Sequence, residues 1–384
     1  MPPSALTSGR WLAEDAAAPK RWRIGTTTAI TLLTGMRGQE RTALVDAVCA
    51  RTGLGRDAVG RLVDDLLASG LLAHPDADGG ADHTRRTRFD AIRRRWRQFN
   101  WTEAVEYHAG TFDYPFLDYA DGGRLLDSYR MRGYVEAEPD TDRHKQYPSA
   151  PRVPLPAPTP ALATGSVAES LAAQPTRWPD AAALSAMLSL TFGQVDHIDH
   201  GRWQRAPMMR RTSPSGGARH PCEGYAIVLD VPGLPPGAYH VDPSQPALER
   251  IRPDVPEPAT LAAIVPIEFH RFDHEIAAVV VVTCVFARNM YRYREPRTFR
   301  TVHNDAGHLA ATAAMAAAAT GLRCQVEYVG DDQTIESYLG LDGLTEGFML
   351  TLSLLSPEPA ATARARRLEA LGANQSQLTR TVEP

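Results

Sequence analysis

Residues 210–221 read RRTSPSGGARHP, and an apolar run from Tyr225 to Val228 follows them. Two adjacent arginines, Arg210 and Arg211, stand before hydroxyl side chains and glycines. Arginine presents a planar fork of donors that fits a phosphate group. Hydroxyl groups both donate and accept hydrogen bonds, and glycines let the backbone come close to a ligand. The stretch predicts a loop around a phosphorylated, polyol-bearing ligand; an ordinary turn of Ser, Pro and Gly is the alternative.

Further short stretches accompany this loop in a fixed order. They are HKQYP at 144–148, PRVPLP at 151–156, GLPPGAYH at 233–240, YRYR at 291–294, FR at 299–300, DAGH at 305–308 and LGLDG at 339–343. Together with the loop, they resemble the signatures of the SagB-type azoline dehydrogenases. These are flavin enzymes of the nitroreductase superfamily that mature thiazole- and oxazole-containing peptides. The likeness spans roughly residues 95–355, and Val241 stands where that family usually has an aromatic residue.

The resemblance implies an α+β fold, in which a nitroreductase-like mixed sheet is flanked by helices and preceded by an N-terminal winged-helix-like module. The expected divisions are a disordered N-terminus at 1–20, a winged-helix-like (peptide-clamp-like) domain at 21–80, a helical and aromatic connector with a proline strap at 81–160, an FMN domain at 161–358 and a C-terminal tail at 359–384.

The same resemblance implies FMN, held where two identical subunits meet. Arg210 and Arg211 are the expected phosphate ligands, with Arg300 as a further candidate. The residues expected to line the ribityl chain and the isoalloxazine edge are Ser213, Ser215, Gly216 and Gly217. No G-x-G-x-x-G fingerprint lies at a strand-to-helix turn, which argues against a Rossmann NAD site.

A lysine and a tyrosine carry catalytic weight in the family, and Lys145 and Tyr147 match that pattern as K-x-Y. Free tyrosine titrates near pH 10 and free lysine near pH 10.4, roughly, so neither alone is a good base at neutral pH. A nearby ammonium would favour the phenolate, or a buried lysine could lose its own proton and act as the base. The sequence leaves both open, together with a surface lysine beside a packed tyrosine.

The N-terminal part has a helical order. Residues 1–20 lack periodicity and are expected to be a frayed terminus. Residues 26–33 predict a short strand or helix, 40–51 and 56–68 two amphipathic helices, and 71–73 the start of a strand. This order resembles a winged helix, which in related enzymes holds a leader peptide as an added strand.

A DNA-binding function for this module is disfavoured by charge. Arg56 and Arg61 face Asp57, Asp64 and Asp65 on the second helix, so its surface is slightly acidic. Phosphate contacts need the opposite sign. A peptide clamp or a purely structural module is the preferred interpretation.

The connector between the two parts carries three unusual stretches. Seven arginines fall within 85–97, as either a solvated helix face or a docking surface for an acidic peptide or a partner enzyme. Aromatic residues recur through 101–119, as core, subunit contact or walls of a substrate channel. Six prolines within 148–160 exclude a helix or a central strand and predict an extended strap.

In the catalytic part, periodicity predicts alternating helices and strands. Helices are expected at 180–192, 305–320 and 334–339, and strands at 225–229, 276–286, 325–329 and 348–354. The run at 276–286 is almost unbroken in β-branched residues, which is typical of a buried central strand.

Composition excludes several classes of function. The chain has 384 residues, a net charge of −4 and 43% hydrophobic residues, as expected of a soluble globular protein without affinity for nucleic acid or a membrane. Its four scattered cysteines predict reduced thiols in the cytoplasm and no metal site.

The sequence thus supports an FMN-dependent azoline dehydrogenase of a peptide-maturation pathway. The expected partners are a second copy of the chain, the leader and azoline core of a precursor peptide, and a cyclodehydratase complex. The alternative is a nitroreductase-fold flavoprotein that reduces a small quinone or nitro compound, or that serves as a non-catalytic scaffold.

Overall fold

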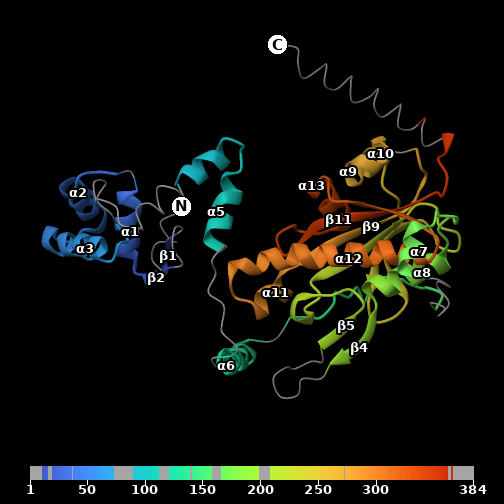
Figure 1. The fold of residues 1–384 in the computed structure, drawn as a ribbon, viewed down its shortest axis with the longest axis horizontal. Coiled ribbons are helices and arrows are strands. Elements are labelled where there is room, and N and C mark those ends of the chain that lie inside the picture. Colours follow the sequence, from blue (N-terminus) through green and yellow to red (C-terminus); the bar gives the residue numbers. More distant parts are fainter. Residues whose placement is uncertain are drawn as a thin grey trace, which may run out of the picture. The chain divides into compact units, whose positions relative to one another are not determined.

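The computed structural model describes residues 11–15, 20–36, 38–72, 90–111, 120, 122–138, 141–157, 166–198, 208–271, 273–361 and 365. The chain divides into two compact units, residues 1–119 and residues 120–384 (Figure 1). The finer domain boundaries expected from the sequence stay a prediction.

The first unit opens with a hairpin and continues as helices. Its elements are β1 (Trp11–Asp15), β2 (Lys20–Ile24), α1 (Thr26–Gly35), α2 (Arg41–Thr52), α3 (Arg56–Ala68) and α5 (Thr102–Thr111). The amphipathic faces of α2 and α3 pack together through Val48, Val59 and Val63, each 1% exposed or less. The predicted helices at 40–51 and 56–68 are therefore confirmed, and 26–33 is helical.

The strands of this unit lie before the helices, which corrects two expectations. Residues 11–15 form β1, although a frayed terminus is expected over 1–20. In the β1–β2 register Trp11 faces Ile24 and Ala13 faces Trp22, and such apolar cross-strand pairs stabilise a hairpin that a single short segment does not reveal. Residues 71–72 form a bend instead of a strand, since the Leu72 N–H donates to the carbonyl of Leu66 at 3.0 Å. Residue 73 lies outside the described residues.

A helical run at residues 90–97 holds the described part of the arginine-rich stretch and contacts α5. Arg93 and Arg97 both bind the carboxylate of Glu106, Arg97 at 2.8 Å. The Trp96 ring stacks on His108 at 5.6 Å. Part of the arginine charge is thus neutralised within the unit. The arginines at 85, 86 and 88 and the aromatic residues at 112–119 lie outside the described residues.

The second unit is built on a seven-stranded sheet in the order β10-β11-β9-β6-β7-β8-β3. The strands are β3 (Arg152–Pro154), β6 (Cys222–Val228), β7 (Gly237–Asp242), β8 (Ala247–Arg252), β9 (Ile276–Val285), β10 (Arg323–Glu327) and β11 (Glu346–Leu355). The α+β class and the central position of the 276–286 strand are confirmed. All the pairings described in this sheet are antiparallel, so the expectation of a mixed sheet is corrected. Antiparallel pairing lets strands that are consecutive in the chain, such as β6–β7 and β7–β8, lie side by side.

Helices cover both faces of this sheet (Figure 1). On one face α8 (Ala181–Phe192) and α12 (Phe299–Ala319) bury an alanine- and leucine-rich core. On the other, α9 (Pro258–Ile264) and α13 (Asp332–Leu339) pack over Tyr225, Ile227 and Val281. The remaining elements are α6 (Gly123–Ala137), α7 (Val167–Ala172), β4 (Gln194–Ile198), β5 (Met208–Arg211), α10 (Pro266–Arg271) and α11 (Phe286–Arg292).

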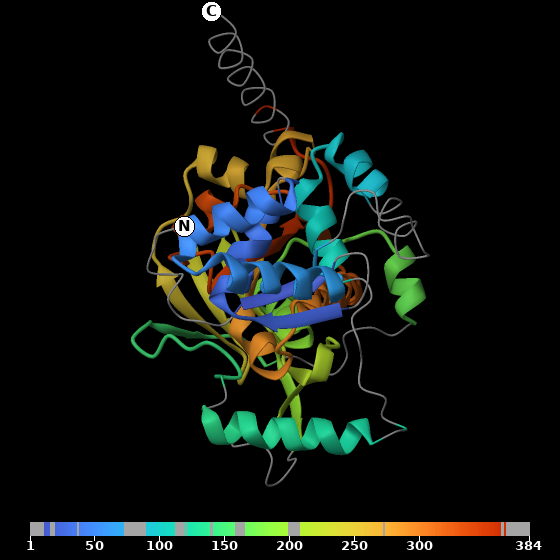
Figure 2. The ribbon, with the colours of Figure 1, turned by 90° about the vertical axis from the view of Figure 1, so that its left-hand side faces the viewer.

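The proline strap and α6 attach to the outside of this unit. The strap contributes β3 at the edge of the sheet, where Val153 pairs with Leu248 of β8. A proline is tolerated there because an edge strand need not donate on both sides. Helix α6 is the separate helix at the foot of Figure 2, and Arg292 binds its Asp127 at 2.6 Å.

Candidate functional site

The loop that carries the RRTSPSGGARHP motif joins β5 to β6 and holds an unusual backbone. Its short 3₁₀ turn spans Gly216–Ala218, and Gly217 has a φ of 61°. Ala218 and His220 also have positive φ, at 49° and 46°. Such conformations are costly for residues with a Cβ and concentrate at ligand sites. The loop is therefore held in place by the contacts around it.

The two arginines at its start point to opposite sides, as consecutive residues of a strand do. Arg210 is exposed and lies 3.7 Å from Asp196 of β4. Arg211 is 9% exposed and donates from Nη1 to the carbonyl of Cys222 at 3.2 Å. Its buried Nη2 has no hydrogen-bond partner, and burial lowers the pKa of Arg211 to about 10. A buried cationic donor without an acceptor fits an anionic ligand group.

The predicted ribityl ligands have partners within the protein. Ser213 Oγ donates to the carbonyl of Thr191 at 2.9 Å. Ser215 Oγ donates to a carboxylate oxygen of Asp305 at 2.7 Å, and the Gly216 N–H donates to the other at 3.0 Å. Burial raises the pKa of Asp305, against the hydrogen bonds from the loop. The first turns of α12 and the glycine loop thus form one assembly. Arg300 lies in the first turn of α12, next to Thr301, whose Cβ is 4.0 Å from a Cβ built on Gly216.

Tyr293 meets the loop at Gly217. A Cβ built on Gly217 would lie 2.3 Å from the Tyr293 hydroxyl, so only glycine fits there. Tyr293 follows α11 and is half-buried, and burial raises its pKa. The sequence singles out its YRYR motif without giving the tyrosine a role. Spacing alone could not show that it reaches the glycine loop.

Lys145 and Tyr147 lie together over the face of the sheet that α9 and α13 cover. Lys145 Nζ donates to Glu346 at 2.7 Å and to the Tyr225 hydroxyl at 3.0 Å. The Tyr147 hydroxyl lies 3.1 Å from that of Tyr225, and Tyr225 donates to Glu346 at 2.8 Å. Burial lowers the pKa of Lys145, but the hydrogen bonds and charges of Glu346 and Tyr147 together raise that pKa above its usual value.

A buried charge cluster connects these residues to the loop. The Lys145 N–H donates to Glu223 at 2.7 Å, and Arg288 binds the same carboxylate. Arg288 Nη1 also donates to the carbonyl of His220, the last residue of the loop with positive φ, at 3.1 Å. Burial raises the pKa of Glu223, yet Arg288 and His240 reverse this and lower it to about 2. None of these partners of Lys145 was predicted from the sequence.

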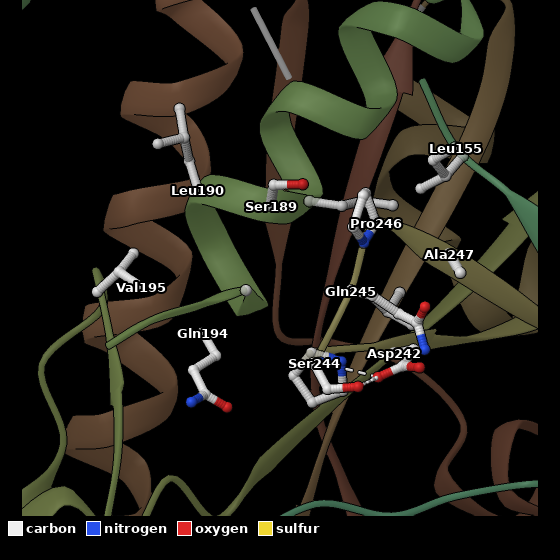
Figure 3. A pocket seen from close by; sticks show the side chains of 14 residues that line it. Leu155, Ser189, Leu190, Gln194, Val195, Asp242, Ser244, Gln245, Pro246 and Ala247 are labelled. Carbon is white, nitrogen blue, oxygen red and sulfur yellow. Dashed lines mark hydrogen bonds between the residues drawn. The ribbon is translucent and has the colours of Figure 1, made fainter. Parts of the chain in front are cut away.

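The described residues of the second unit line hollows. One of about 270 Å³ lies between the end of α8 and the turn from β7 to β8, and it is lined mostly by apolar side chains (Figure 3). In its wall Asp242 accepts hydrogen bonds from Ser244. Another, of about 580 Å³, is lined by Tyr291, Tyr293 and Met290 among others. Because Tyr293 lines this second hollow and also contacts Gly217, the hollow borders the glycine loop.

One curated relative matches most of this chain, and another matches a shorter part of it. It is 26% identical over 317 residues to the trifolitoxin-processing protein TfxB of Rhizobium leguminosarum bv. trifolii, which covers 80% of this chain and 82% of the relative. It is 32% identical over 113 residues to the nitroreductase-like protein MJ1384 of Methanocaldococcus jannaschii, which covers 29% of this chain and 54% of that one. No family model matches the chain.

Solved structures resemble it in part. A nitroreductase-like protein of Anabaena variabilis has a TM-score of 0.42 and 22% identity, covering 60% of this chain and 45% of that one. The E. coli microcin synthetase McbBCD complex with truncated pro-MccB17 has a TM-score of 0.36 and 16% identity, covering 62% of this chain and 94% of that one.

The antiparallel sheet with helices on both faces gives the second unit an α+β fold. The ordered motifs resemble those of the SagB type, and the chain is similar to TfxB along most of its length. No helix in the described ranges is both long and apolar enough to cross a membrane.

Proposed function

We propose that this protein is an FMN-dependent azoline dehydrogenase, which oxidises thiazoline or oxazoline rings of a ribosomally made peptide to thiazoles or oxazoles. The observation that carries the proposal is Arg211, a buried guanidinium with an unpartnered Nη2 at the base of a glycine loop. The likeness to a protein named for trifolitoxin processing supports a peptide substrate.

The residues around the loop fit FMN. Arg211 would bind its phosphate, because Nη2 is already desolvated and lacks an acceptor. Gly217 would let the backbone approach the flavin ring, with the Tyr293 hydroxyl next to it. When bound, FMN supplies a hydride acceptor that can pass its electrons on to oxygen. Arg210 points away toward Asp196, so we propose a smaller part for it than for Arg211.

Forming an azole removes a hydride and a proton from the azoline ring, so the site must also supply a base. Lys145 is held as an ammonium by Glu346 and cannot accept that proton. We propose Tyr147 as the base, with the Lys145 ammonium 5.1 Å from its ring centre attracting the negative charge that develops. Burial strongly raises the pKa of Tyr225, which stays protonated and links Tyr147 to Glu346.

Tyr293 is the competing base. It touches the glycine loop directly, whereas the link from the Tyr147 segment runs from the Lys145 N–H through Glu223 and Arg288. The Tyr293 ring also borders the hollow of about 580 Å³, which would admit a ring carried on a peptide. Substitution of each tyrosine separates the two roles.

The proposed partners are a second copy of the chain, the precursor peptide and a cyclodehydratase, in the cytoplasm. The first unit supports the peptide role, because its β1–β2 hairpin pairs with no further strand among the described residues and could add a leader in an extended conformation. Its α3 carries Asp57, Asp64 and Asp65, which is the wrong sign for DNA.

The proposal is tested with purified protein and a synthetic azoline peptide. Conversion to the azole with oxygen, without added NAD(P)H, supports the dehydrogenase. Turnover of a small quinone or nitro compound with NAD(P)H, and none of the peptide, would favour the nitroreductase alternative. Bound FMN without either turnover would favour the scaffold.

A further inference from the structure

We propose that Asp305 is a positioning residue that sets the shape of the flavin loop by holding the Ser215 hydroxyl and the Gly216 N–H. The inference rests on the proposed FMN site and goes beyond it, since it gives a role to a residue that does not itself bind the cofactor.

Asp305 reaches the loop with both carboxylate oxygens. Oδ2 accepts the Ser215 hydroxyl at 2.7 Å, and Oδ1 accepts the Gly216 N–H at 3.0 Å. Ser215 is used in both directions, because its Oγ also accepts the N–H of His220 at 2.9 Å. With its proton given to Asp305, Ser215 has no donor left for a ligand. The Gly216 N–H is occupied in the same way.

The environment of the Asp305 carboxylate makes its charge depend on hydrogen bonds. Asp305 is 5% exposed in the long helix α12, and no lysine or arginine in the described ranges forms an ion pair with it. A buried anion without a cationic partner is unfavourable unless hydrogen bonds satisfy it. Here those hydrogen bonds come from the loop itself. The loop and the carboxylate therefore depend on each other.

The loop needs such an anchor because of its backbone. Gly217, Ala218 and His220 all have positive φ, and two of them carry a Cβ. The three bonds among Asp305, Ser215, Gly216 and His220 close around this stretch and fix where Gly217 meets Tyr293. Without Asp305 we expect the stretch to relax toward ordinary backbone angles.

The test uses the full chain, four single variants and the double variant that combines Asp305→Asn with Ser215→Ala. Asp305→Ala removes both acceptors, Asp305→Asn keeps only one, and Ser215→Ala removes one donor. Asp331→Asn is the matched control, because Asp331 also accepts a backbone N–H, from Thr334 at 2.7 Å, but caps α13 on the opposite face of the sheet. The readouts are amide hydrogen exchange of residues 215–220 without FMN and the Kd for FMN.

We expect Asp305→Ala to speed exchange of the Gly216 and His220 amides at least tenfold and to raise the Kd for FMN by about tenfold or more, the equivalent of a lost hydrogen bond to a charged group. The effects of Asp305→Asn and Ser215→Ala on the Kd should be less than additive in the double variant, because both substitutions act on the same contact between Ser215 and residue 305. The Asp331→Asn variant should match the wild type.

Unchanged exchange at Gly216 and His220 in Asp305→Ala would overturn the inference, and so would faster exchange without a change in FMN affinity. Exchange is measured without cofactor. A wild-type protein that binds no FMN but loses loop protection in Asp305→Ala would contradict the FMN proposal and leave the positioning of the loop supported.

Discussion

The ammonium of Lys145 lies 2.7 Å from a carboxylate oxygen of Glu346, a residue 201 positions later in the chain. Burial lowers the pKa of Lys145, but Glu346 and Tyr147 together raise it more through their hydrogen bonds and charges. The sequence leaves a neutral lysine base and a tyrosine base open. Because the ion pair holds Lys145 as an ammonium at neutral pH, we propose a tyrosine as the base.

Two phenols are available, and substitution tells them apart. We expect Tyr147→Phe to keep FMN and lose about 10²–10⁴-fold in azole formation, as removal of a general base does. Tyr293→Phe should lose less, since it removes only the hydroxyl beside Gly217 and keeps the packed ring. Single-turnover azole formation by each variant is the measurement. A large loss in Tyr293→Phe with near-normal turnover in Tyr147→Phe would transfer the base to Tyr293.

Cofactor affinity should depend on Arg211 far more than on Arg210. Arg211→Ala removes a charge-assisted contact worth about 1.5–3 kcal/mol, so the Kd for FMN should rise about 10- to 150-fold. Arg210→Ala is the matched control, because Arg210 is exposed and lies near Asp196. Flavin fluorescence titration measures both, and the melting temperature checks that each variant folds. Equal losses in both variants would return Arg210 to the phosphate site.

Stability should fall in acid through Glu223. Its pKa is lowered from 4.5 to about 2 against the effect of burial, so its contribution to folding is complete above about pH 4.5 and is lost as the pH falls toward 2. A shift of this size corresponds to about 3 kcal/mol. Glu223→Gln should therefore lower the free energy of unfolding at neutral pH and flatten its decline between pH 4.5 and 2. Denaturant unfolding across this range measures both, and parallel pH profiles would contradict the prediction.

Leader recognition should depend on the first unit. Removal of residues 1–80 takes away the β1–β2 hairpin and α1–α3, and should leave FMN binding unchanged, since the loop and Asp305 lie in the second unit. Azole formation should fall more on a peptide with its leader than on a leaderless fragment, because the leader raises the effective concentration of each ring at the flavin. Equal rates on both peptides would make the unit structural.

The fold was predictable where periodicity is strong and local. The helix at 180–192 begins after the Asp180 cap, whose side chain accepts the Ala183 N–H, and the buried run at 276–286 is the central strand β9. The β1 strand was missed because Trp11 and Trp22 become a pattern only when the two strands pair. Antiparallel pairing of the whole described sheet is likewise invisible in single segments.

The candidate site was predictable as motifs but not as contacts. The glycine loop and the Lys145 segment are recognisable in sequence. The partners that define their chemistry, Asp305, Glu346 and Glu223, come from distant elements of the fold. Strand alternation could have separated Arg210 from Arg211 in advance, because consecutive residues of a strand face opposite sides.

The most direct test of the proposed function follows one purified sample through one reaction. When the wild-type protein is heated, the flavin that it releases should be FMN, close to one per chain. The intact protein, given a synthetic thiazoline or oxazoline peptide and oxygen without NAD(P)H, should remove two hydrogens per ring, read as the mass decrease and the azole absorbance. Colourless protein that cannot be loaded with FMN, or loaded protein that leaves the azoline mass unchanged with and without the leader, would contradict the account.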